Sequence, residues 1–195
     1  MFDIILASKS KVRLDILNKN NVVCSAKPSN VDEDEIKISM LKDGASPKDV
    51  SKNLAEIKAN KVSQNNLDKI VIGADSVIDL ENEIISKPKN RSEALDILRK
   101  LNGKTHFLIS SVCISKNGSM IWHYTDMAEM KMKTMTEDEL KIYLSKIEDE
   151  QLYAYNVYQI EGEGRTLFSN IEGDEDTIMG LPIKKIKEYL NNLKC

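Results

Sequence analysis

Apolar and polar positions alternate along the chain with two periods, one typical of strands and one typical of helices. The clearest strand pattern is the apolar run KIVIGADSVID at residues 69–79. Strands are expected over residues 3–7, 22–26, 69–79, 106–115 and 120–132, and a glycine-punctuated strand pair is expected over 158–172. Asn117 and Gly118, between two of these strands, form the preferred pair for a tight hairpin turn.

Helical spacing of apolar residues predicts five helices, and capping residues mark where several of them begin. They are expected over residues 10–20, 48–63 and 90–101, after a capping box of Thr136 and Glu139, and from Pro182 onward. Residues 28–47 are polar and broken, and no element is assigned to them. This order of strands and helices predicts a mixed α/β fold with several hairpins.

Composition narrows the class of protein. The chain has 195 residues, a length that suits one domain over residues 1–195. Its net charge of −3 provides no basic field for nucleic acid, and no apolar run approaches the roughly 20 residues that cross a bilayer. Three cysteines, odd in number and widely spaced, argue against a disulfide framework and a zinc site. The expected setting is a reducing cytoplasm, with no membrane and no nucleic-acid partner.

Asp75 is the sharpest chemical feature of the sequence. It interrupts the apolar run IVIGADSVI, where an unpaired carboxylate would be costly to bury. Gly73 leaves room for close approach, and the apolar pattern resumes at once with Val77, which is unusual for an aspartate that caps a turn. Asp75 is therefore a candidate functional carboxylate.

The junction between the first strand and the first helix, Ser8-Lys9-Ser10-Lys11-Val12-Arg13, is a candidate anion site. A helix N-terminus presents free N–H groups and partial positive charge, which suits an anion. The hydroxyl and cationic donors that would add to it are those of Ser8, Ser10, Lys9, Lys11 and Arg13. Ser8 or Ser10 can instead simply cap the helix, with the lysines in solvent. Both interpretations are open from these residues alone. No glycine-rich loop of the Walker or dinucleotide-binding type is present.

Three further charged residues are candidates for a site. Lys58 lies four positions from both Leu54 and Val62, so it falls on the inward stripe of its helix and either reaches into a cleft or snorkels to the surface. Lys87 precedes a proline, which favours an extended backbone. Glu33 lies in the acidic run VDEDE and is either solvated or a ligand of a divalent cation that bridges phosphates.

Glu161 lies in the segment YQIEGEG, whose glycines suggest close approach of the backbone to another group. His106 and His123 fall in expected strands without the spacing of paired metal ligands. Both histidines are therefore expected to be hydrogen-bonded strand residues.

In this order, these segments resemble the Maf family, the Maf-like septum formation inhibitors and nucleoside triphosphate pyrophosphatases, over nearly the whole chain. LASKSKVR is similar to the family's LASxSPRR, VDE to its acidic motif, LAEIKA to LAxxKA, and GADSVI to GADTVV. SKPKNRSEALDILRKLNGKTH resembles KPxxxxEAxxxLxxLxGxxH, and YQIEGEG with IEGDEDTIMGLPI resembles the C-terminal signature. Six similarities in register make a chance match improbable.

The resemblance implies an elongated, two-lobed Maf/ITPase-like α/β fold, with a twisted mixed sheet flanked by helices and a central cleft. It implies hydrolysis of the bond between the α- and β-phosphates of a non-canonical or modified nucleotide, giving a nucleoside monophosphate and pyrophosphate. The implied cofactor is Mg²⁺ or Mn²⁺. A homodimer and roles in nucleotide-pool sanitation and cell-division arrest are implied as well.

The resemblance also assigns roles by position. Asp75 becomes the catalytic carboxylate that activates water. Glu33 and Asp75 become metal ligands. The implied substrate-binding residues are Ser8, Arg13, Lys58, Lys87 and Glu161.

Three positions depart from the family pattern. SPRR appears as Ser10-Lys11-Val12-Arg13, and a lysine cannot reproduce the two-pronged bonding of the missing arginine. AGAY appears as Tyr155-Asn156-Val157-Tyr158, which changes the pocket wall. The pyrimidine branch has glutamine where this chain has Glu161, whereas the 7-methyl-GTP branch has glutamate, which favours a modified purine. Ala74-Asp75-Ser76 points towards the pyrimidine branch instead.

Two other functions fit parts of the sequence. The missing arginine would suit a non-catalytic nucleotide-binding regulator of septum formation, which binds nucleotide without turnover. An unrelated α/β interaction module would have no use for an inward lysine, so Asp75, Lys58 and Lys87 argue against it.

Overall fold

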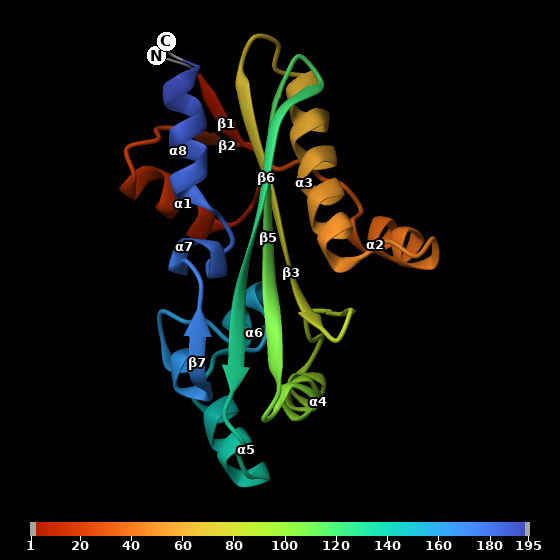
Figure 1. Ribbon diagram of the computed structural model, residues 1–195, viewed down its shortest axis with the longest axis vertical. Coiled ribbons are helices and arrows are strands. Elements are labelled where there is room, and N and C mark those ends of the chain that lie inside the picture. The colour runs from red at the N-terminus through yellow and green to blue at the C-terminus, as the bar shows by residue number, and fades with distance from the viewer. Residues whose placement is uncertain (1–2, 194–195) are drawn as a thin grey trace.

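The computed structural model describes residues 3–193 and shows an elongated molecule built on one mixed sheet (Figure 1). The strands are β1 (Ile4–Leu6), β2 (Ser25–Ala26), β3 (Ile70–Leu80), β4 (Glu83–Ile85), β5 (Thr105–Lys116), β6 (Ser119–Met132) and β7 (Phe168–Glu172). The helices are α1 (Lys11–Lys19), α2 (Glu33–Lys42), α3 (Pro47–Gln64), α4 (Arg91–Leu101), α5 (Glu137–Ser145), α6 (Asp149–Tyr155), α7 (Glu175–Ile178) and α8 (Ile183–Asn192), with a 3₁₀ turn η1 (Glu163–Leu167). The predicted two-lobed α/β fold with a twisted mixed sheet is confirmed.

Three long strands, β3, β5 and β6, run the length of the molecule and are joined antiparallel. The sheet order is β2-β1-β3-β5-β6-β7, and β1 is parallel to both of its neighbours. The outer edge of β3 is shared between two short strands, because β1 pairs with residues 70–72 and β4 pairs with residues 78–80. The edge between these two pairings, which includes Asp75, is left open.

Strand alternation sends neighbouring side chains of β3 to opposite faces of the sheet. On one face, Val71 packs with Val62 of α3, and Gly73 allows α3 to approach so closely that a Cβ there would lie 2.7 Å from the Ala59 backbone nitrogen. On the other face, Ile72 and Ala74 pack in a cluster that includes α1 and α8. Asp75 therefore faces α3, and the next residue faces the opposite side.

A second apolar cluster fills the lobe at the bottom of Figure 1. It joins the far ends of the long strands to α4, α5 and α6, through residues such as Ile78, Leu98, Leu140 and Leu152. Because β3 contributes to both clusters, Asp75 lies where the two lobes meet.

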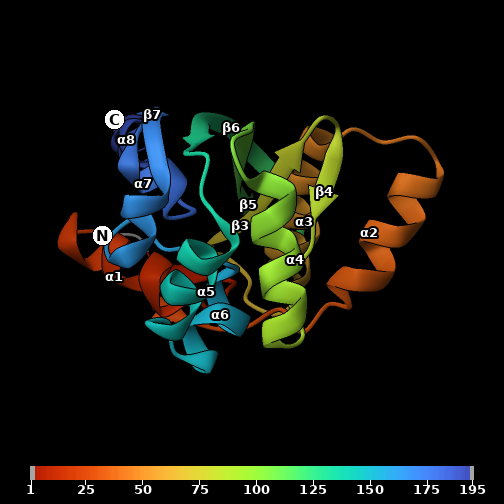
Figure 2. The same cartoon turned by 90° about the horizontal axis from the view of Figure 1, so that it is seen from below.

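Helix α2 stands apart from the rest of the molecule (Figures 1 and 2). None of its residues is buried, and Ile38 and Leu41 are exposed. It begins with Asp32 as N-cap, whose side chain accepts from the backbone N–H of Glu35. The polar composition of residues 28–47 led to no predicted element there. That prediction was wrong, because N-capping and first-turn acids support a helix that buries almost nothing.

Several other elements differ from prediction. Residues 158–172 form one strand, β7, preceded by a turn and η1, and not a strand pair, because residues 158–167 fold into turns, of which residues 158–161 line a cavity. The short elements β4, α6 and α7 were not predicted, since each is too short to show a period. The capping box of Thr136 and Glu139 and the hairpin turn at Asn117-Gly118 are confirmed.

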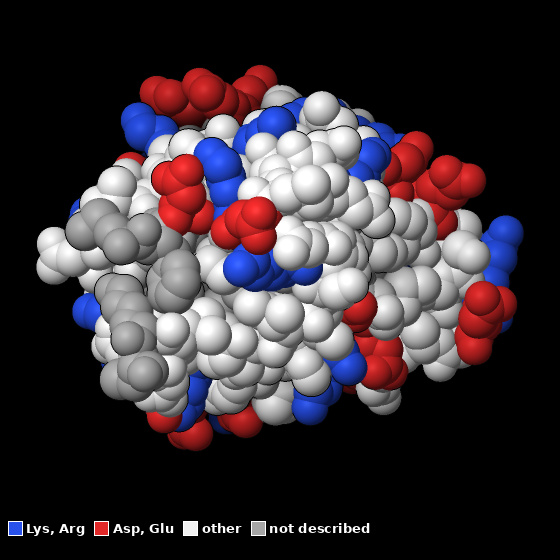
Figure 3. Space-filling view, turned by 90° about the horizontal axis from the view of Figure 1, so that it is seen from above, with Lys and Arg blue, Asp and Glu red and all other residues white. Residues whose placement is uncertain are grey.

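Charges of both signs are interspersed on the end of the molecule that is uppermost in Figure 1, without one extended basic surface (Figure 3). No helix within residues 3–193 combines the length and apolar character needed to cross a membrane.

Candidate active site

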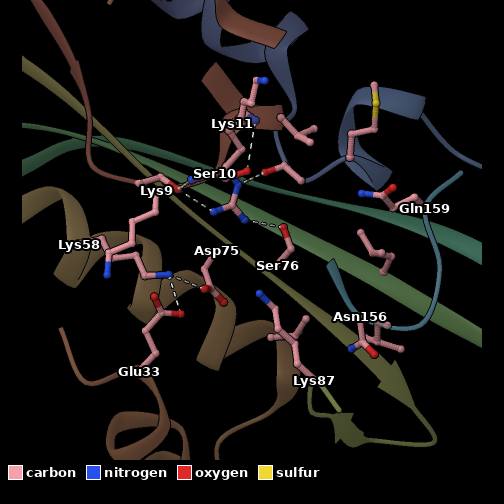
Figure 4. A pocket seen from close by; sticks show the side chains of 18 of the residues that line it. Lys9, Ser10, Lys11, Glu33, Lys58, Asp75, Ser76, Lys87, Asn156 and Gln159 are labelled. Carbon is pink, nitrogen blue, oxygen red and sulfur yellow. Dashed lines mark hydrogen bonds and ion pairs between the residues drawn. The ribbon is translucent and has the colours of Figure 1, made fainter. Parts of the chain in front are cut away.

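A cavity of about 690 Å³ opens where the edge of β3 is unpaired (Figure 4). Its volume lies in the range of small-molecule sites. Asp75, Lys58 and Glu33 line one end of it, and Asn156 and Gln159 line the opposite end. Every residue predicted as part of a site borders this one cavity: Ser8, Arg13, Glu33, Lys58, Asp75, Lys87 and Glu161.

A buried ammonium joins two carboxylates at the first end. Nζ of Lys58 lies 2.7 Å from Oδ1 of Asp75 and 2.9 Å from Oε2 of Glu33. The side chains of Lys58 and Asp75 are only 6% and 5% exposed, whereas that of Glu33 is 43% exposed. The inward orientation predicted for Lys58 is confirmed, and its direct partners are carboxylates.

Helix α3 holds Asp75 at two points. The ammonium of Lys58 donates to the side chain of Asp75. The hydroxyl of Ser51, seven residues earlier on the same face of the helix, donates to the backbone carbonyl oxygen of Asp75 at 3.1 Å. Oδ2 of Asp75 is buried and has no hydrogen-bond partner among the described residues. A buried carboxylate oxygen without a partner is costly, so this atom is available to a water, a substrate group or a cation.

Arg13 takes the place of a strand at the open edge of β3. The Ile72 carbonyl accepts from the Ala7 N–H at the end of β1, and the next carbonyl on that edge, Ala74, accepts from Nη1 of Arg13 at 2.9 Å. Arg13 also donates to the Gly180 carbonyl at 2.9 Å. Burial lowers the pKa of this guanidinium, and attraction from acidic groups opposes that shift.

The two serines that precede α1 have separate roles. Ser10 is the N-cap of α1, since its Oγ accepts from the Arg13 backbone N–H at 3.3 Å. Oγ of Ser8 accepts from the Ser10 N–H at 3.1 Å and from Nη1 of Arg13 at 3.4 Å. Ser8 therefore borders the cavity next to a helix N-terminus that presents donors.

A hydrogen-bonded chain leads from Arg13 across the sheet to the C-terminal segment. Nη2 of Arg13 donates to Ser76 Oγ at 3.1 Å, which lies 2.8 Å from Ser110 Oγ. Ser110 donates to the Thr177 carbonyl, and the Thr177 hydroxyl donates to Asp126. This chain fixes Arg13 between three segments that are distant in sequence, and sequence patterns did not reveal it.

Several cationic side chains line the cavity around Asp75. Partial burial, followed by repulsion from Arg13, lowers the pKa of Lys87 although its side chain remains open to the cavity. Burial alone would raise the pKa of Glu33, but attraction and a hydrogen bond from Lys58, aided by Lys37, outweigh it and hold that pKa below its usual value.

Three cationic residues to which the resemblance assigned no role also line the cavity. They are Lys37, four residues after Glu33 on α2, and Lys9 and Lys11 at the junction between β1 and α1. In Figure 4 the side chain of Lys9 runs towards Lys58, whereas that of Lys11 extends away from it. The i, i+4 spacing of Glu33 and Lys37 would have revealed Lys37 once α2 was recognised as a helix.

The far end of the cavity is formed by the loop after α6, which is anchored to the core. The Tyr143 hydroxyl donates to the Val157 carbonyl at 2.8 Å, and Nε2 of His106 lies 2.8 Å from the Tyr158 hydroxyl. Burial lowers the pKa of His106 to about 4, so the ring is neutral near neutral pH. The expected hydrogen bonding of His106 is confirmed, and Glu161 lies exposed at the cavity rim.

A divalent cation fits this donor set only with help from substrate. Within residues 3–193, no group of three or more histidine, cysteine or acidic side chains is placed to hold a metal ion by itself. Oδ2 of Asp75 and the Glu33 oxygen that does not bond Lys58 provide two oxygen donors. Phosphate oxygens and water would have to complete the shell, which is the usual arrangement for Mg²⁺ in nucleotide sites.

Comparison with known protein sequences gives consistent matches over nearly the whole chain. A family model described as Maf-like protein matches residues 3–193. A relative from Pelagibacter ubique (strain HTCC1062), named nucleoside triphosphate pyrophosphatase, is 67% identical over 192 residues, or 98% of each chain. One from Brucella abortus biovar 1 (strain 9-941), named 7-methyl-GTP pyrophosphatase, is 35% identical over 98% of this chain and 96% of its own.

Among solved structures, a HAM1 protein from Coxiella burnetii aligns with 68% of this chain and 73% of its own. The TM-score is 0.45 and the identity 16%, too distant to bear on the site.

Proposed function

Because this chain belongs to the Maf-like protein family, we propose that it is a nucleoside triphosphate pyrophosphatase, which hydrolyses the bond between the α- and β-phosphates of a nucleotide. The products are a nucleoside monophosphate and pyrophosphate. The names of its relatives support the reaction, and the observation that carries it in this chain is the partnerless Oδ2 of buried Asp75, at the edge of a cavity lined by lysines.

The chemistry follows from that geometry. Oδ2 of Asp75 accepts a proton from a water whose oxygen attacks the α-phosphorus, and the bond to the bridging oxygen breaks in line with the attack. The electron pair leaves with pyrophosphate. Lys58 fixes the carboxylate through Oδ1, so that Oδ2 faces the cavity. Such positioning and charge neutralisation supply most of the catalysis in phosphoryl transfer.

Phosphate contacts are assigned by charge and access. Lys87 and Ser8 face the cavity, and we assign them to the phosphates together with Lys9, which partly replaces the missing arginine. Four of the five N–H groups of Arg13 already bond to protein, so Arg13 positions this wall and offers one remaining N–H. A bound Mg²⁺ or Mn²⁺, held by Glu33 and Asp75, would neutralise charge on the phosphates.

The test is a panel of nucleoside triphosphates with Mg²⁺ or Mn²⁺, in which pyrophosphate and inorganic phosphate are quantified separately. Asp75→Asn should lower kcat by about 100-fold or more, the usual contribution of a general base. Asp79→Asn is the matched control, because Asp79 lies on the same strand but does not line the cavity. Products of nucleoside diphosphate plus phosphate would overturn the proposed bond, and full activity in Asp75→Asn would overturn the role of Asp75.

A non-catalytic nucleotide-binding regulator is not favoured. It would need the cationic cavity but not a buried carboxylate held by a lysine with one oxygen left unpaired. Nucleotide binding without turnover under any metal would support it.

The identity of the nucleotide base is a separate proposal from the reaction. Relatives carry the names nucleoside triphosphate pyrophosphatase and 7-methyl-GTP pyrophosphatase. Comparing 7-methyl-GTP, UTP and dTTP in Glu161→Gln and in the unmodified protein tests whether Glu161 selects a modified purine.

A further inference from the structure

Asn156 has a backbone conformation that side chains rarely adopt. Its φ is 74° and its ψ is −165°, a region that is essentially restricted to glycine. Other asparagines in the chain have positive φ, such as Asn82 at 68° and Asn117 at 52°, but they lie in exposed hairpin turns. Asn156 is 8% exposed and lines the cavity, so the strained backbone places a polar side chain at the substrate site.

The orientation of the Asn156 carboxamide is fixed by a backbone donor. Its Oδ1 accepts from the Val157 N–H at 2.9 Å, so Nδ2 is the group that is left to face other partners. Nδ2 has one long contact, 3.5 Å to the Ser86 carbonyl, which is at the limit of a hydrogen bond. Asn156 therefore offers a donor to the cavity, and its carbonyl oxygen is already engaged.

Gln159 adds a second carboxamide at this end of the cavity. It is half-buried, it lines the same end of the cavity, and its side chain makes no hydrogen bond to the described residues. Asn156 and Gln159 lie opposite the group formed by Asp75, Lys58 and Glu33 (Figure 4). A nucleotide whose α-phosphate meets Asp75 would extend its base towards these two carboxamides.

We propose that Asn156 is a specificity-determining residue of this site, whose Nδ2 donates to a ring carbonyl of the base, with Gln159 accepting from the adjacent ring N–H. This inference rests on the proposed pyrophosphatase function. Guanine, hypoxanthine, uracil and thymine present a carbonyl next to a ring N–H. At the corresponding edge, adenine (C6 and N1) and cytosine (C4 and N3) present an amino group next to an unprotonated ring nitrogen. The amino group cannot accept from Nδ2, and the ring nitrogen cannot donate to Gln159. The site therefore selects keto bases over amino bases.

The test compares kcat/KM for GTP, 7-methyl-GTP, ITP, UTP and dTTP with that for ATP and CTP. Asn156→Asp keeps the acceptor for the Val157 N–H but replaces the donor with a second acceptor. Asn156→Gly removes the carboxamide and relieves the backbone, so we expect it to fold. Both variants should lower the ratio of keto to amino activity by about tenfold, the effect of one hydrogen bond.

Asn82→Gly is the matched control, a glycine at another positive-φ asparagine outside the cavity, and its ratio should equal that of the unmodified protein. An unchanged ratio in folded Asn156→Asp and Asn156→Gly overturns the proposal, as does an unmodified protein without keto preference. Loss of fold in both variants would show a structural role and also overturn it.

Absence of hydrolysis of every nucleotide would count against the pyrophosphatase function and not against Asn156. In that case, calorimetric binding of GMP and UMP against AMP and CMP, in the same variants, decides the inference by the same criteria.

Discussion

The ammonium of Lys58 lies 2.7 Å from Oδ1 of Asp75, and both side chains are almost fully removed from solvent. The pair joins the central strand of the sheet to α3 at the point where the two lobes meet. Fold and chemistry therefore depend on the same ion pair.

Lys58→Met should destabilise the fold by about 3 kcal/mol, because it leaves the Asp75 carboxylate buried without a counter-charge. The free energy of unfolding, from urea denaturation, measures this loss. In Lys58→Met with Asp75→Asn, most of the stability should return while activity stays absent. Wild-type stability in the single variant would contradict a structural role for the pair.

Arg13→Lys should cost about 1–3 kcal/mol of stability and lower kcat/KM, because an ammonium cannot bond Ala74, Ser76 and Gly180 from one plane. Arg99→Lys is the control, because Arg99 pairs with Glu137 on the surface, where such bridges contribute little. Equal effects of the two substitutions on thermal unfolding and on kcat/KM would refute a bracing role for Arg13.

The lowered pKa of Lys87 leads to a prediction of how substrate affinity changes at alkaline pH. The pKa of Lys87 is lowered, so its positive charge is present at low pH and is lost as pH rises through a value below that of an ordinary lysine. KM should therefore rise on the alkaline side. Lys87→Arg, which keeps its charge, should flatten that rise in a KM–pH profile; an unchanged profile would assign the titration to another group.

The lowered pKa of buried His106 leads to a prediction of how the free energy of unfolding changes in acid. Its pKa is about 4 when folded, below the ordinary 6.5, so the unfolded chain binds the proton first and stability falls as pH drops from 6.5 towards 4. The shift corresponds to about 3 kcal/mol at the acid end. Denaturation curves at several pH values should show this slope, and His106→Gln should reduce it. A slope that persists unaltered in the variant would exclude His106 as its source.

Gly73→Ala should weaken both stability and activity. A Cβ there would meet the Ala55 and Ala59 backbone of α3, so the helix that carries Lys58 must move away from the strand. Gly162→Ala is the control, since no atom lies within 4 Å of a Cβ at that position. Thermal melts and kcat/KM of the two variants should differ clearly; similar values would mean that α3 can shift without cost.

Sequence patterns predicted which residues line the cavity better than they predicted the contacts between those residues. Asp75 and Lys58 were each conspicuous because a charge interrupted an apolar period, and periodicity reports burial directly. Asn156 was noted only as a change in the pocket wall, and Gln159 was not singled out, since the conformation of this segment is set by turns with no period. Likewise, α2 is stabilised by capping and not by burial, so its apolar pattern carried no signal.

The resemblance assigned Arg13 to the substrate, whereas most of its donors hold the protein together. The hydrogen bond from Arg13 to Gly180 joins residues that are more than 160 positions apart, and no local sequence pattern contains that information. Long-range hydrogen bonds of this kind have to be seen in three dimensions.

The continuous strands also limit how the molecule can move. β3, β5 and β6 each contribute residues to both apolar clusters, so these strands connect the two lobes and resist bending between them. Closure around a nucleotide must then come from the rim. Helix α2, which buries no residue and carries Glu33 and Lys37, is the element that can swing at the least cost to the fold.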